Sequence, residues 1–183
     1  MAFYQRFILP HIVHAACGVR PAMRQRALIV PQAHGRVLEV GFGSGLNLPF
    51  YDTDKVKHLW ALEPSAGMHA KARDAIGEAT LETEIVASPA EDIPLDNHCA
   101  DSVVITYTLC TIAKVPEAME EIRRVLKSGG DLLFCEHGAA PDQSIKRWQN
   151  IVNPLWKALG GGCHLNRPIP ALITAGGFRF REL

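Results

Sequence analysis

Short apolar runs alternate along the chain with longer segments in which apolar positions recur at helical spacing. The runs are rich in β-branched residues and are bounded by glycine or polar residues, which predicts strands. These strands cover residues 35–40, 58–62, 84–87, 101–107, 131–136 and 178–183. Helices are predicted between them, over residues 21–30, from an N-cap at Ser65 to about 76, from Pro116 to about 126, and over 143–159 with a break at Pro154.

This alternation of strands and helices predicts an α/β protein with a Rossmann-like, mostly parallel sheet and helices on both faces. The sequence has no internal repeat, low-complexity tract or linker, so one domain is expected. Residues 1–34 precede the first strand and form an N-terminal helical arm, and residues 35–183 form the main domain. Trp148 and Trp156 lie eight positions apart on a helical stretch and are expected to pack in the core.

Composition narrows the class of protein. Of 183 residues, 48% are hydrophobic and 21% are charged, which is typical of a globular domain. The formal net charge is zero, so no nucleic-acid partner is expected. No run of 18 apolar residues exists to span a membrane. Residues 15–17 resemble a lipoprotein cleavage site, but Pro10, His11 and His14 interrupt the apolar run before them. Five scattered cysteines indicate reduced thiols in a cytoplasmic protein.

The charge is unevenly distributed. The first 38 residues contain five arginines and no Asp, Glu or Lys, which leaves a net charge of −5 for the rest of the chain. The arm could therefore make a weak, salt-sensitive contact with an anionic membrane surface or ligand. A solvated helix face is the other interpretation of the same pattern.

A glycine-rich loop follows the first predicted strand, with the sequence Glu39-Val40-Gly41-Phe42-Gly43-Ser44-Gly45. Glycines let a backbone turn tightly and approach a ligand closely. The G-x-G-x-G spacing differs from the G-x-G-x-x-G of dinucleotide-binding folds. The second strand ends in Glu63, where a carboxylate can accept both hydroxyls of a ribose. Together these features predict a nucleoside site.

Several motifs then appear in one order, and they cover roughly residues 35–138. The segments 37–45 and 62–68, then 90–95 with 99–104, and finally 121–130 resemble the signature of class I S-adenosylmethionine-dependent methyltransferases of the methyltransferase type 11 group. Within that family, residues 135–137, 153–157 and 162–167 resemble the branch of methyltransferase-like thiol methyltransferases. The resemblance implies S-adenosyl-L-methionine as cofactor.

The resemblance also implies a cofactor site. Glu39 positions the methionine amino group through the loop, and Glu63 binds the ribose diol. The other cofactor positions implied are Gly41, Gly43, Gly45, Asn47, Pro64, Met68, Ala90, Glu91, Thr106 and Leu109. Two departures stand out. Pro89 occupies a position where many relatives have an Asp for the adenine amino group, so Glu91 or the backbone must serve instead. The family usually continues through a further strand hairpin, so either the last strand is missing or something else covers the sheet edge.

The acceptor side is expected to hold His137 as acid–base catalyst, just past the fifth predicted strand. A histidine hydrogen-bonded in a turn is the alternative. The resemblance adds acceptor-site residues, which are Tyr4, Trp156, Cys163, His164 and Arg167. No metal is expected, because Cys163-His164 has no second ligand pair at recognisable spacing. The arm is expected to close over the cleft as a lid.

The predicted function is therefore in-line methyl transfer to a small molecule, which is a thiol, amine, quinone or lipid headgroup. Such a reaction chiefly needs alignment of the reactants and exclusion of water. A nicotinamide-dependent oxidoreductase shares the fold but has different glycine spacing. A catalytically inactive S-adenosylmethionine-binding or membrane-surface module is the non-enzymatic alternative.

Overall fold

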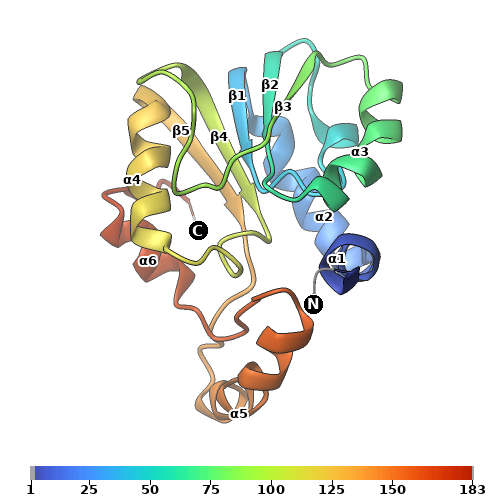
Figure 1. The fold of residues 1–183 in the computed structure, drawn as a ribbon. Helices are drawn as coiled ribbons and strands as arrows, with labels where there is room; N and C mark the ends of the chain where they lie inside the picture. Colours follow the sequence, from blue (N-terminus) through green and yellow to red (C-terminus); the bar gives the residue numbers. More distant parts are fainter. Residues whose placement is uncertain (1–2, 183) are drawn as a thin grey trace.

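The computed structural model describes residues 3–182, which build a five-stranded parallel sheet (Figure 1). The strands are β1 (Gly35–Val40), β2 (Val56–Leu62), β3 (Thr83–Val86), β4 (Ala100–Thr106) and β5 (Leu126–Cys135). Their order across the sheet is β3-β2-β1-β4-β5. The order changes direction between β1 and β4, and ligands of open parallel sheets bind beyond the carboxyl ends of the strands at such a point.

The apolar residues of each inner strand divide between two faces, as the pleat requires. Leu38 and Val40 of β1 join one core cluster, whereas Val37 joins a second cluster. Both clusters continue into the neighbouring strands, because β1 pairs in register with β2 and with β4. The sheet is therefore buried on both sides, which explains why its strands appear as continuous apolar runs.

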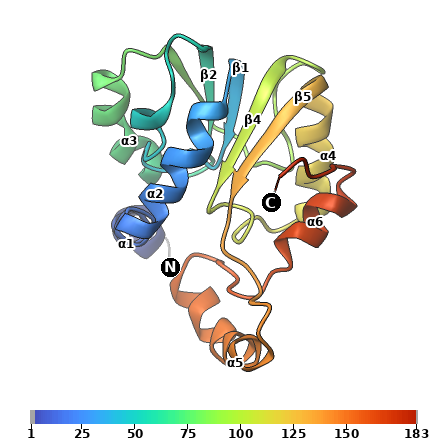
Figure 2. The same cartoon turned by 180° about the vertical axis from the view of Figure 1, so that it is seen from behind.

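Helices cover both faces, as predicted (Figures 1 and 2). One face packs against α4 (Val115–Val125) and α6 (Ile169–Ala175). The other face packs against α3 (Ala66–Glu78) and the segment of α2 (Arg20–Ile29) with the 3-10 turn Val30–Gln32. Ser65 caps α3 by accepting the amide of Met68, as its position before the helix predicts.

The arm begins with a π-helical turn, Tyr4–Ile8, and continues as α1 (Leu9–Cys17) and α2. The carbonyl of Arg6 lies so close to Gly67 that a Cβ at Gly67 would approach it to 2.6 Å. This contact seats the arm on the first turn of α3. A second 3-10 turn, Leu48–Phe50, follows the glycine loop.

Helix α5 (Gln143–Leu159) projects from the body below the carboxyl ends of the strands (Figure 1). It continues through Pro154, so the predicted break is wrong. Trp148 and Trp156 are 67% and 39% exposed, so their predicted burial in the core is also wrong. The polar side of α5 is the one that is bonded to the body, for example through Gln149, which donates to the carbonyl of Gly138 and accepts the amide of Ala140.

The predicted strand over 178–183 is not formed by residues 178–182, and Leu183 lies outside the described residues. The amide of Phe178 turns back to the carbonyl of Ile173 in α6, so it is not available to a sheet. The segment nevertheless covers part of β5 through side chains. The Phe180 ring packs 5.8 Å from that of Phe134, and Arg181 pairs with Asp131 at 3.1 Å.

The strand before this edge starts earlier than predicted. α4 ends at Val125, and β5 begins at Leu126 rather than at Asp131. Gly129 and Gly130 lie within β5, where the register against β4 shifts between Ala100 and Ser102. The glycine pair therefore belongs to an irregular strand rather than to a helix stop.

No helix among residues 3–182 combines the length and apolarity needed to cross a bilayer.

Candidate active site

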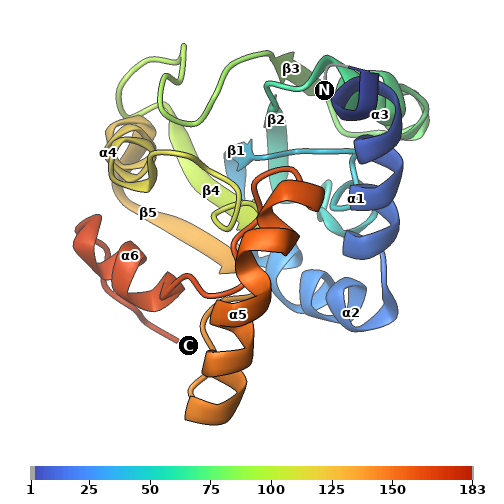
Figure 3. The same ribbon diagram turned by 60° about the horizontal axis from the view of Figure 1, so that its bottom comes forward.

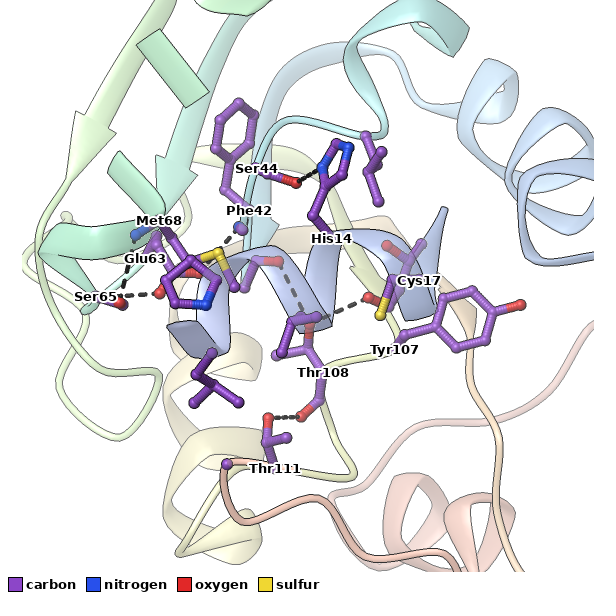
Figure 4. A pocket seen from close by; sticks show the side chains of 18 of the residues that line it. His14, Cys17, Phe42, Ser44, Glu63, Ser65, Met68, Tyr107, Thr108 and Thr111 are labelled. Carbon is purple, nitrogen blue, oxygen red and sulfur yellow. Dashed lines mark hydrogen bonds between the residues drawn. The ribbon is translucent and has the colours of Figure 1, made fainter. Parts of the chain in front are cut away.

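Two adjoining cavities lie beyond the carboxyl ends of the strands, with volumes of about 210 and 380 Å³. They share walls, which are formed by Gly41, Glu63, Thr108, Thr111 and Gly161. The smaller cavity extends beneath the arm and contacts Met68 (Figure 4). The larger one extends along the ends of β2 and β3. Together they form a concave site of the size that small-molecule ligands occupy.

The glycine loop forms the floor between the cavities. Gly41, Gly43 and Gly45 all have positive φ angles, of 74°, 60° and 80°. A side chain at Gly41 would collide with Thr108, which comes from the loop after β4. Glycine is thus required both for the turn and for the close approach of two loops. Gly41 and Gly43 line the cavities, as predicted for a loop that meets a ligand.

Glu63 is held at the edge of both cavities by two backbone amides. One carboxylate oxygen accepts the amide of Gly43 and the other accepts the amide of Ser65, each at 2.9 Å. Burial raises the pKa of Glu63, and the amides of Ser65 and Gly43 oppose that shift. Each oxygen has a second lone pair for a ligand hydroxyl, because a carboxylate offers about four acceptor sites. This geometry suits the ribose-binding role that the resemblance implies.

Glu39 lies behind the loop and is only 1% exposed, so it does not reach either cavity. Its two oxygens accept hydrogen bonds from Asn47 Nδ2 at 2.9 Å and from the Tyr51 hydroxyl at 2.7 Å. Burial raises the pKa of Glu39 to about 7, against the opposing effect of these two donors. Asn47 is also fully buried. Both residues therefore support the loop rather than line the site.

Arg26 completes this buried network and was not a predicted site residue. Its guanidinium donates to Asn47 Oδ1 at 2.7 Å and to Thr106 Oγ1 at the end of β4. It also lies 5.0 Å from the centre of the Tyr107 ring. Arg26 thereby joins the arm to the loop and the sheet. The sequence contains a signal for it only in the arginines of a segment without acidic residues.

The arm forms one side of the smaller cavity. Leu9, Pro10, Val13 and Cys17 of its first helix line that cavity. His14 Nδ1 lies 2.7 Å from Ser44 Oγ in the glycine loop, which ties α1 to the cofactor side of the site (Figure 4). This placement agrees with the predicted lid, although closure itself remains a prediction.

The residues implied for the adenine lie around the larger cavity. Pro64, Ala90 and Glu91 line it together with Pro89. Glu91 Oε1 accepts the amide of Lys114 at 3.0 Å, which fixes the carboxylate against the start of α4. Thr106 lines the smaller cavity, but Leu109 is fully buried in the core, so its predicted place in the cleft is wrong.

His137 lies at the end of β5, but it does not line either cavity. Its ring is stacked near Tyr107, which does line the smaller one, with the ring centres 6.4 Å apart. Nε2 of His137 lies 3.3 Å from Cys163 Sγ. This hydrogen bond raises the pKa of His137, with burial opposing the shift. His137 thus lies behind the wall of the smaller cavity to which Tyr107, Gly160 and Gly161 contribute, which we call the acceptor wall.

The other predicted acceptor residues gather around the same wall without lining the cavities. His164 and Arg167 bond the carbonyls of Cys110 and Leu109, in the loop after β4. Tyr4 donates its hydroxyl to the carbonyl of Leu159 at 2.7 Å, which links the arm to the end of α5. Trp156 is 39% exposed and lines neither cavity. These residues shape the wall that Gly160 and Gly161 present to the cavity.

Glu136 is a further buried acid that sequence reasoning did not place in the site. One of its oxygens accepts the amides of Thr108 and Leu109, and the other has no hydrogen-bond partner. Burial raises its pKa to about 7. Glu136 therefore fixes the loop after β4, just as Glu39 fixes the loop after β1.

Comparison with known proteins agrees with this geometry. Residues 38–134 match the family model described as a methyltransferase domain. The human thiol S-methyltransferase TMT1B is 36% identical over 141 residues, which are 74% of this chain and 57% of that protein. A phosphatidylethanolamine N-methyltransferase of Cereibacter sphaeroides is 29% identical, over 70% of this chain and 67% of that protein.

Solved structures show the same fold. A SAM-dependent methyltransferase from Thermotoga maritima superposes with a TM-score of 0.65 at 22% identity, covering 98% of this chain and 81% of that one. The chain belongs to the class I S-adenosylmethionine-dependent methyltransferases, in the methyltransferase domain family. It spans little more than half the length of the thiol S-methyltransferases that it matches.

Proposed function

We propose that the protein transfers the methyl group of S-adenosylmethionine to the sulfur of a small thiol by in-line displacement. The observation that carries this choice is the 36% identity to a thiol S-methyltransferase across most of the chain.

The cavities fit the cofactor through features of the chain itself. The floor is a glycine turn that side chains would obstruct, and Glu63 presents carboxylate oxygens beside it. We assign the ribose to Glu63, the methionine end to the loop that Glu39 and Asn47 support, and the adenine to Pro64, Ala90 and Glu91. Met68, which lines the smaller cavity, is also assigned to the adenine. Bound S-adenosylmethionine supplies a methyl group on a positively charged sulfur.

The chain then has to align the acceptor and exclude water. The apolar side chains of α1 cover the cavity, so the arm performs the exclusion. Thr106 and Thr108 form the opposite wall. His137 acts from the second layer, as the group that orients the acceptor or assists loss of its proton. Tyr4, Trp156, Cys163, His164 and Arg167 shape the wall that the acceptor meets.

Release of S-adenosylhomocysteine across matched panels of thiols, amines, phenols, quinones and phospholipids tests this function. The proposal expects turnover with thiols at rates well above those with the other classes. Turnover with amines or quinones alone would overturn the choice of acceptor. Tight S-adenosylmethionine binding with no turnover across the panels would favour the inactive module instead.

A specific observation also favours contact with a membrane surface. Helix α5 exposes a row of apolar residues at helical spacing, which are Ile145, Trp148, Val152, Leu155 and Leu159. Its polar side is hydrogen-bonded to the body, so the usual orientation of an amphipathic helix is reversed. Helix α1 of the arm lies at the same end of the molecule as α5 (Figure 3). The arm adds exposed Phe3, Phe7 and Ile12.

The charges around this surface support an anionic lipid partner. Lys146, Arg147 and Lys157 lie on α5, and the helix itself contains no acidic residue. An apolar row with tryptophan and flanking cations is typical of helices that lie in the headgroup region of an anionic bilayer. We therefore propose that α5 and the arm dock on a lipid surface, from which an apolar acceptor enters the cleft. Arg26 takes no part, because it is buried in the site network.

A further inference from the structure

Three soft ligand side chains meet behind the acceptor wall, and each comes from a different part of the chain. Cys110 lies in the loop after β4, His137 follows β5, and Cys163 follows α5. Their ligand atoms all lie within 4.8 Å of one another. Sequence spacing could not reveal this group, because 27 and 26 residues separate its members along the chain.

The geometry of the group suits a tetrahedral metal ion. His137 Nε2 and Cys163 Sγ are 3.3 Å apart, and two such ligands on one zinc ion stand about 3.6 Å apart. The side chains of Cys110 and Cys163 are buried, with 2% and 9% of their surface exposed. The third ligand atom, Cys110 Sγ, lies within 4.8 Å of both.

The choice of ion follows from the ligand types. A buried thiolate without a compensating charge is costly. A divalent cation would offset two thiolate charges at once, and thiolates favour zinc-like ions over magnesium or calcium.

We infer that Cys110, His137 and Cys163 bind a thiophilic divalent cation of the Zn²⁺ class. Three protein ligands leave one position of a tetrahedral ion for water or a substrate, as in catalytic zinc sites. Tyr107 lines the smaller cavity, and its ring stacks with that of His137 at 6.4 Å between centres. The ion therefore lies behind the wall that an acceptor meets.

None of the three ligands lines either cavity, so the fourth position is assigned to water. His137 is then a metal ligand rather than a free base.

Metal titration tests the site without any methyl transfer. Protein stripped with a chelator and kept reduced with a phosphine is titrated with Zn²⁺ and with Co²⁺ alone, and binding is followed by calorimetry and by thiolate-to-cobalt absorption. One equivalent is expected, with the absorption of two thiolates.

Variants identify the ligands. Cys163→Ser and His137→Gln should each weaken Co²⁺ binding at least tenfold, whereas Cys99→Ser, at the opposite end of the sheet, should bind as the wild type does. Because His137 is only half-buried, the His137→Gln variant provides the test if the cysteine variants fail to fold. Calorimetry with S-adenosylmethionine confirms that each variant keeps its cofactor site.

Two results would overturn the inference. The first is equal Co²⁺ binding by wild type and by Cys163→Ser. The second is no metal uptake by reduced wild-type protein in which all five thiols remain free. A failure of the proposed function would instead leave metal binding intact while no thiol is methylated.

Discussion

Glu63 accepts the amide of Gly43 at 2.9 Å, and this one bond joins the end of β2 to the glycine loop that follows β1. The same carboxylate is anchored by Ser65 on its other oxygen. A ligand that bonds Glu63 therefore meets a group whose position is already fixed by two elements, and it loses little conformational freedom on binding.

Replacing Glu63 with alanine should weaken S-adenosylmethionine binding at least tenfold. The change removes two charge-assisted hydrogen bonds to the ribose, each worth about 1.5–3 kcal/mol. Calorimetry measures the dissociation constant, and Glu82→Ala, which removes an exposed carboxylate elsewhere, is the matched control. Unchanged affinity in Glu63→Ala would exclude the ribose assignment.

Arg26 should matter for stability far more than its neighbour Arg24. Arg26→Gln leaves the buried Asn47 Oδ1 without its donor and removes one of the two donors to Thr106 Oγ1, which costs about 1–3 kcal/mol of unfolding free energy. Arg24 is exposed on the same helix, so Arg24→Gln should change the unfolding free energy by less than about 0.5 kcal/mol. Urea denaturation compares the two variants. Equal values would mean that the network does not hold the arm.

The fold could be predicted from the sequence because buried parallel strands and capped helices leave local signals. The strand ends at Val40, Leu62 and Thr106 follow from apolar runs that stop at glycine or polar residues. Ser65 is similarly a local cap. These features depend on residues close together in the chain, and pattern analysis detects such residues well.

The parts that could not be predicted depend on contacts between distant segments. Arg26 reaches Thr106 across 80 residues, and Cys110 meets Cys163 across 53, so no spacing rule applies. The prediction that Trp148 is buried failed for another reason. An apolar row at helical spacing does not say whether it faces the body or solvent, and here the polar row is bonded to the body.

Glu39 should make the stability of the protein depend on pH. Its pKa is about 7 in the folded state against 4.5 in the unfolded reference, so the folded state favours the protonated form. The stabilisation is complete below pH 4.5 and is lost as the pH rises through 7, an effect on the order of 3 kcal/mol. Denaturation from pH 5 to 8 should therefore show a steeper decline for wild type than for Glu39→Gln.

Glu136 also has a pKa of about 7, and it is present in both the wild type and the Glu39→Gln variant. The difference between wild type and Glu39→Gln thus isolates the contribution of Glu39. Identical slopes for the two proteins would show that Glu39 keeps an ordinary pKa.

Removal of residues 1–18 should reduce turnover at least tenfold while the domain stays folded. The deletion opens the smaller cavity to water, because α1 forms its cover. Arg26 and the rest of α2 remain, so the network that holds the glycine loop is kept. Initial rates at saturating acceptor, with circular dichroism of the same samples, make the comparison. Full turnover by the folded, shortened protein would rule out the lid.

The row on α5 should be needed for binding to lipid. Leu155 and Leu28 are 66% and 65% exposed, but only Leu155 belongs to the row, so Leu155→Ser and Leu28→Ser form a matched pair. In vesicle sedimentation with anionic lipid at low salt, Leu155→Ser should bind several-fold more weakly than wild type, because less apolar surface enters the headgroup region. Leu28→Ser should bind as wild type does. Salt should weaken all three, since each cation near the surface contributes about 1 kcal/mol. Absence of vesicle binding by the wild type, or equal losses in both variants, would show that the exposed row of α5 serves some purpose other than lipid contact.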